Sequence, residues 1–177
     1  MRKSARQTKK LALSAMFTAL GVAILYLGCF IEVMELTVAA VAAVLILLAV
    51  IEMGKRTATL IWLSTSILAL LLLPTKFIAL EYAFFIGSYP LIKAFSEKFS
   101  KAISWIVKIL FVNLAIGLLI VLGHFVFGYP LESFWMMVAT FLLASFTGVI
   151  FDVALTRLVT LYLERLRRTL RMDRLLK

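Results

Sequence analysis

Charged side chains are scarce in this sequence of 177 residues. Only 16% of the residues are Asp, Glu, Lys or Arg, whereas soluble domains carry about a quarter. Hydrophobic residues make up 64% of the chain and the mean hydropathy is +1.08. Because a soluble domain of this size could not bury so much apolar surface, the surplus must be solvated by lipid. The composition predicts a single-domain integral membrane protein.

Cysteine and the common catalytic motifs are also nearly absent. The single Cys29 cannot form an internal disulfide and has no Cys or His nearby with metal-ligand spacing, so we expect it to serve packing. The sequence contains no glycine-rich phosphate loop, no paired metal-ligand spacing and no nucleophile elbow. We therefore expect no metal, no cofactor and no enzymatic activity, and energy for active transport would have to come from another subunit or an ion gradient.

Long apolar runs predict six transmembrane helices. The first run, from Leu11 to Phe30, is long enough to cross a hydrocarbon core of about 30 Å and longer than the core of a signal peptide. Glu52–Arg56 alone separates the second and third runs, which are expected to be short or tilted. The six predicted helices span residues 11–31, 36–52, 57–73, 77–95, 102–126 and 133–163.

The net charge of +10 predicts the orientation of these helices. With the N-terminus inside, 17 of the 19 Lys and Arg residues lie on the inner side, including Lys93 at the inner end of the fourth helix. The exceptions are Lys76, outside, and Lys108, within the fifth helix. We therefore predict that both termini are cytoplasmic and, since the basic residues lie between apolar runs, no nucleic-acid binding.

The chain divides into a six-helix membrane domain, residues 1–163, and a basic tail, residues 164–177. In and before the tail, Leu158, Tyr162, Leu166 and Leu170 recur every four residues, with arginines on the other faces, which predicts an amphipathic helical extension. This extension is expected to lie along the inner headgroups of the membrane lipid or to dock a partner.

Small residues follow one stripe of the first predicted helix. Ala15, Ala19 and Ala23 recur every four residues, with Gly21 nearby. Such a stripe lets helix backbones approach closely in lipid. The pattern fits packing within the monomer and packing against another subunit equally well.

Ionisable residues inside predicted spans are candidates for function, because burying a charge in a membrane is costly. Glu81 lies about one turn into the fourth helix, where an outward-opening site and a local pair with Lys76 are both possible. For Lys108, we expect the side chain to reach back toward the inner headgroups. Asp152 has two candidate partners, Arg157 five residues later and Lys108 at a similar depth.

Polar residues near the outer ends of the helices define a predicted ligand pocket. Asn113 lies in the fifth helix, and His124 near its outer end, although a lone His at a membrane boundary is also typical of an interfacial position. The predicted ligand-binding residues are Glu32, Glu35, Lys76, Glu81, Asn113, His124 and Glu132.

Two segments carry a family resemblance. The segment from Lys9 to Leu20, KKLALSAMFTAL, resembles the start of a substrate-binding S component of the energy-coupling factor (ECF) transporters. The segment from Gly87 to Lys93, GSYPLIK, is similar to uncharacterised S-component-like bacterial membrane proteins. The length and the number of predicted spans agree with this family, which implies a multi-pass protein of the bacterial plasma membrane.

The resemblance implies binding of a vitamin or metabolite from the outside and uptake together with an energising module. In S components an Ala-x-x-x-Ala motif contacts the transmembrane coupling subunit, and it corresponds here to Ala15 and Ala19; two ATPase subunits supply the energy. The connection around residues 31–35 is shorter than the lid of many S components, and no vitamin-specific signature is present. The alternatives are a membrane scaffold in a cell-envelope assembly and, third, a membrane enzyme.

Overall fold

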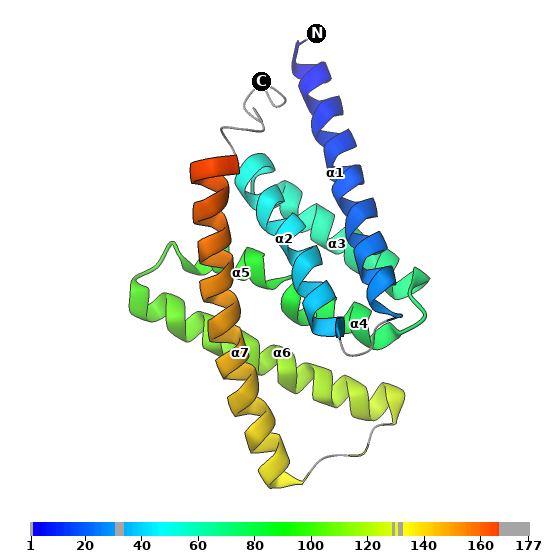
Figure 1. Ribbon diagram of the computed structural model, residues 1–177, viewed down its shortest axis with the longest axis vertical. Coiled ribbons are helices and arrows are strands. Elements are labelled where there is room, and N and C mark those ends of the chain that lie inside the picture. Colours follow the sequence, from blue (N-terminus) through cyan, green and yellow to red (C-terminus); the bar gives the residue numbers. More distant parts are fainter. Residues whose placement is uncertain (1, 31–33, 129, 131–132, 167–177) are drawn as a thin grey trace.

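The computed structural model of the protein describes residues 2–30, 34–128, 130 and 133–166, with side chains from Gln7 to Glu164 within those ranges. The described part of the chain is helical, without strands (Figure 1). The elements are α1 (Arg2–Gly28), α2 (Glu35–Met53), α3 (Lys55–Leu72), α4 (Lys76–Glu81), the π-helical η2 (Tyr82–Ile86), α5 (Tyr89–Ser96), α6 (Lys101–Phe127), α7 (Phe134–Leu161) and the π-helical η3 (Tyr162–Leu166).

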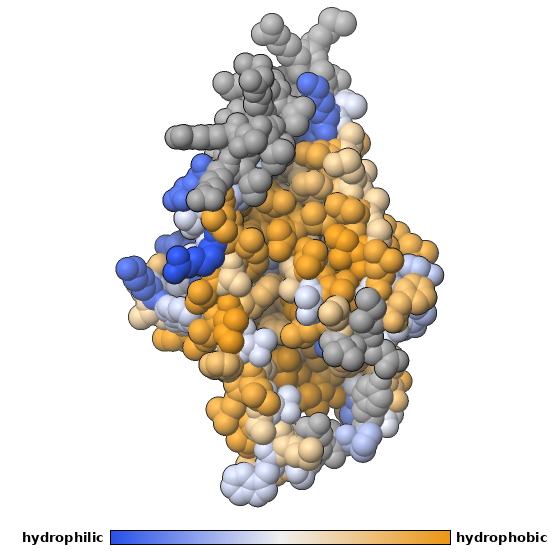
Figure 2. Space-filling view, viewed as in Figure 1, coloured by the Kyte–Doolittle hydropathy of each residue, from blue (hydrophilic) through white to orange (hydrophobic). Residues whose placement is uncertain are grey.

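Six helical stretches are long and apolar enough to cross a membrane, which agrees with the six predicted spans. They are Gln7–Gly28, Glu35–Met53, Lys55–Leu72, Lys76–Ser96, Lys101–Phe127 and Phe134–Glu164. Apolar side chains dominate the middle of the face in Figure 2, as expected for a surface in contact with lipid. The side of the membrane on which each terminus lies stays a prediction, and residues 167–177 of the predicted tail lie outside the described residues.

The first three spans pack closely against one another, and α2 and α3 also pack against the fourth. Small side chains of α2, among them Ala39, Ala42 and Ala43, are fully buried and let neighbouring helices approach. Gly54 joins α2 to α3 with a φ of 87°, a conformation that glycine adopts without steric cost. The fourth span buries a larger share of its residues than any other.

The fourth span is not one continuous α-helix. It begins as α4, continues as the π-helical η2 and ends as α5, and the N–H of Gly87 donates to the carbonyl of Tyr82 at 2.8 Å. π-helical turns inside α-helices are frequent at functional sites. The sequence analysis predicted a single uninterrupted helix here, because the apolar run continues through the π-helical turn.

The last two spans cross each other, and their predicted outer ends lie apart in Figure 1. They touch where Gly148 of α7 faces Val112 of α6, and a Cβ atom at Gly148 would lie only 2.9 Å from a Val112 methyl group. Asn113 and Ser145 form a polar contact one turn away, with Nδ2 and Oγ at 3.0 Å. The separation of the outer ends leaves room for a cavity beside α4.

Candidate ligand pocket

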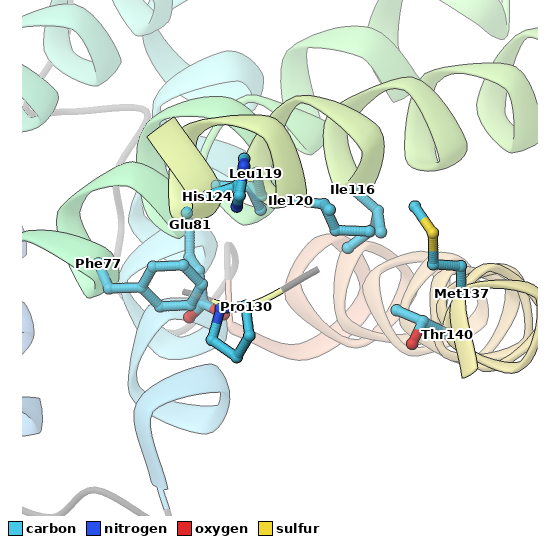
Figure 3. A pocket seen from close by; sticks show the side chains of 10 residues that line it. Phe77, Glu81, Ile116, Leu119, Ile120, His124, Pro130, Met137 and Thr140 are labelled. Atoms are coloured by element: carbon cyan, nitrogen blue, oxygen red, sulfur yellow. The ribbon is translucent and has the colours of Figure 1, made fainter. Parts of the chain in front are cut away.

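A cavity of about 260 Å³ lies between α4, α6 and α7 (Figure 3). Under the predicted orientation it is on the outer side, because it adjoins the start of the fourth span, the end of the fifth and the start of the sixth. Its lining residues are Phe77, Glu81, Ile116, Leu119, Ile120, Gly123, His124, Pro130, Met137 and Thr140.

Glu81 is the acidic residue of this cavity. It lies four residues after Phe77 in α4, so both side chains project from the same face of the helix. The Oε2 atom of Glu81 is buried and has no hydrogen-bond partner among the described residues. Buried carboxylate oxygens are normally hydrogen-bonded, so this atom calls for a partner that the chain itself does not supply.

The ionisable side chains of the cavity lie at one end, and the other end is mostly apolar. In Figure 3, Phe77, Glu81 and His124 gather on one side, whereas Ile116, Met137 and Thr140 lie on the other. Most of the remaining lining side chains come from one face of α6 and are aliphatic. A small amphiphilic molecule would find a carboxylate for its polar group and an apolar wall for its body.

The nearest lysine along the chain is already engaged. Lys76 donates to the carbonyl oxygens of Leu73 at 2.8 Å and Leu71 at 3.4 Å, at the end of the preceding helix. In the described contacts it forms no ion pair with Glu81 and does not line the cavity. Of the two possibilities considered for Glu81, the local pair with Lys76 is absent from the described contacts, and the site stays a prediction.

The other predicted ligand-binding residues are distributed unevenly. His124 lines the cavity, as the sequence analysis expected. Glu35, in the first turn of α2, is not part of the lining. Asn113 does not line the cavity, because its amide bonds Ile109 O at 2.9 Å and Ser145. Glu32 and Glu132 lie outside the described residues.

A second polar cluster, formed by Lys93, Lys108 and Asp152, lies between α5, α6 and α7. The Nζ atom of Lys93 is 2.6 Å from Asp152 Oδ1, and that of Lys108 is 3.0 Å from Oδ2. All three side chains are at most 8% exposed. The hydroxyl of Tyr89 also donates to Asp152, at 3.2 Å, and Lys93 bonds the hydroxyl of Thr156.

This cluster corrects one expectation and confirms another. Lys108 does not reach back to the headgroups, because it is paired with Asp152 inside the protein. Lys93, at the inner end of the fourth span, lies within α5 and is 3% exposed. The pairing of Asp152 with Lys108 is confirmed, whereas Arg157 is exposed and takes no part in the described cluster.

The alanine stripe of α1 faces outward. Ala15, Ala19 and Ala23 are all exposed. The first two line an open groove of about 680 Å³ between α1 and α3, together with polar side chains such as Ser14 and Ser64, whereas Ala23 is not part of its lining. Ala15 and Ala19 are therefore available to another subunit rather than used for close packing within the monomer.

The cavity and the charge cluster are connected through the fourth span. Glu81 lies immediately before η2, and Tyr89 and Lys93 of the cluster follow it in α5. A ligand that contacts Glu81 would therefore touch the same span whose Tyr89 and Lys93 bond to Asp152. No protein-family model, curated protein or solved structure matches the chain.

Proposed function

We propose that the protein is an S-component-like membrane protein that binds a small molecule from the outside and works with an ECF-type energising module for its uptake. The observation that carries this proposal is the buried, unpartnered Oε2 atom of Glu81 in a cavity between three spans. A membrane scaffold whose polar residues only fix helix packing would have no need for such an atom.

The exposed groove between α1 and α3 supports the second half of the proposal. A coupling subunit must contact this protein within the membrane, where close approach of helices depends on small residues. Ala15 and Ala19 lie in the groove, beside Thr18 and Thr57, whose hydroxyl groups could form interhelical hydrogen bonds. The partner surface that we propose is therefore centred on Ala15 and Ala19 and excludes Ala23.

Filling the cavity should abolish ligand retention. In the variant Ile120→Trp, the indole would occupy the space between α6 and α7, because Ile120 lines the cavity. We expect native mass spectrometry of the purified protein to detect a bound small molecule in the wild type and none in this variant. The matched control is Val121→Trp. The Val121 side chain belongs to the same helix, is 49% exposed and does not line the cavity.

Retention of a molecule by the control but not by Ile120→Trp supports binding in this cavity. The contrary result is wild-type protein that, purified from its native membrane, carries no small molecule and co-purifies with cell-envelope proteins. That result would favour the scaffold and contradict the proposal.

Bulky side chains in the groove should block recruitment of the energising module. The double variant Ala15→Leu/Ala19→Leu would fill the groove, so we expect the coupling subunit and the ATPase subunits to be lost from the protein purified from its native membrane. The control Ala23→Leu makes the same change outside the groove and should retain them. Equal recovery of these subunits with all three proteins would contradict the assigned surface.

A further inference from the structure

We infer that the molecule bound in the cavity is a small monoamine, with one ammonium group on a compact apolar body. This inference rests on the proposed function and specifies the chemical class of its ligand. It depends on three properties of the cavity, which are the buried carboxyl oxygen of Glu81 without a hydrogen-bond partner among the described residues, the ring of Phe77 and the size and character of the apolar wall.

The buried carboxyl group of Glu81 is suited to a cationic hydrogen-bond donor. None of the described lining residues is Lys or Arg. Lys76 donates to backbone carbonyls and Lys93 to Asp152, so neither supplies a hydrogen bond to Glu81 in the described contacts. An ammonium group would supply the missing donor and counter-charge, whereas an anionic ligand would be repelled.

The aromatic ring beside Glu81 favours the same group. Phe77 lines the polar end of the cavity, and its ring packs edge-to-face against Phe127 with centroids 6.2 Å apart. This contact fixes the orientation of the ring. Cations are attracted to the face of an aromatic ring, and the attraction increases where water is excluded. A carboxylate and a phenyl ring together are therefore a better receptor for an ammonium group than for a neutral hydroxyl.

The remaining wall limits the body of the ligand. Ile116, Leu119, Ile120 and Met137 offer aliphatic surface, and their side chains provide neither a charge nor a strong hydrogen-bonding group. The volume of about 260 Å³ is below the range of about 300–1,000 Å³ that is usual for ligand pockets. It accommodates a single ring or a short branched chain. A zwitterionic amino acid fits poorly, because its carboxylate would lie near Glu81 without a lysine or arginine in the described lining.

The test compares three molecules of the same shape and different charge. Phenethylamine, 2-phenylethanol and phenylacetate are titrated into the full-length protein in lipid nanodiscs, and binding is measured by calorimetry. We expect the amine to bind about tenfold more tightly than the alcohol, since a charge-assisted hydrogen bond is lost with the alcohol. Phenylacetate should bind more weakly than either.

Two variants at acidic residues link this preference to Glu81. Glu81→Gln should reduce the affinity for the amine by about tenfold and leave that for the alcohol nearly unchanged. The control Glu52→Gln removes a carboxylate that accepts a hydrogen bond from Tyr162 and is not part of the cavity lining. It should preserve both affinities. A monodisperse peak in size-exclusion chromatography shows that each variant is folded.

The outcomes separate the ligand class from the proposed function. If the alcohol or phenylacetate binds more tightly than the amine, and Ile120→Trp abolishes that binding, the ligand is not a monoamine but the proposed binding function still holds. Equal amine affinity in the wild type and Glu81→Gln, or binding of none of the three probes, also overturns it. Both proposals are contradicted if native mass spectra show a bound lipid that is lost in Ile120→Trp and retained in Glu81→Gln.

Discussion

Replacing Asp152 by leucine is expected to lower the free energy of unfolding by about 3–5 kcal/mol, the range typical of breaking a buried ion pair. Asp152 accepts hydrogen bonds from Lys93, Lys108 and Tyr89 and is 5% exposed. Without its carboxylate, two ammonium groups would face each other inside the protein, and only the half-exposed Glu97 would remain near them. The measurement is reversible SDS unfolding in detergent micelles, followed by circular dichroism.

A triple variant distinguishes loss of the charge balance from loss of packing. Combining Asp152→Leu with Lys93→Met and Lys108→Met removes all three buried charges and keeps similar side-chain volumes. Because apolar replacement of a whole buried ion network is often neutral, we expect this protein to recover most of the lost stability. A triple variant as unstable as Asp152→Leu alone would show that the stability of this region depends on shape rather than on charge.

The sequence predicted the six spans because each is a long apolar run with few interruptions, which length and hydropathy alone reveal. Burial of individual charges was harder to predict. Lys93 is followed by Glu97 and Lys98, so its neighbours in sequence are those of an exposed connection. Its burial follows from Asp152, 59 residues away, which no local pattern relates to it.

The candidate pocket was only partly predictable for the same reason. Glu81 and His124 were visible as polar residues in apolar surroundings. Ile116 and Met137 of the apolar wall are indistinguishable in sequence from the many side chains that face lipid. Only the crossing of α6 and α7 decides which of them line a cavity, and crossing angles are set by side-chain packing rather than by hydropathy.

For Asn113 the sequence predicted too much. This polar residue was assigned to the pocket, but in the structure it contributes to helix packing. Its side chain bonds to the backbone of its own helix and to Ser145 of α7. In a membrane interior such interhelical hydrogen bonds satisfy polar groups and hold helices together. The contact instead helps to fix the crossing of α6 and α7 from which the cavity arises.

Replacing Gly87 by alanine is expected to destabilise the protein by about 1–3 kcal/mol, the usual effect of overpacking. The added Cβ atom would lie 2.6 Å from the carbonyl oxygen of Tyr82 and 2.7 Å from its ring. Neither can yield easily, because the carbonyl accepts the π-helical hydrogen bond and the Tyr82 ring is fully buried. Since Tyr82 follows Glu81 directly, binding of phenethylamine should weaken as well.

Gly117→Ala is the matched control for this prediction, because it places the same methyl group in another membrane-spanning helix. There the Cβ atom would meet only the ring of Phe141, at 3.8 Å, which is ordinary van der Waals contact. Alanine is favoured over glycine within helices by about 0.5–1 kcal/mol, so this variant should be as stable as the wild type or more so. Unfolding in SDS measures both variants. If Gly87→Ala proves as stable as Gly117→Ala, the close contact between Gly87 and Tyr82 does not hold the π-helical turn, and the position of Glu81 must be fixed by the packing of α4 instead.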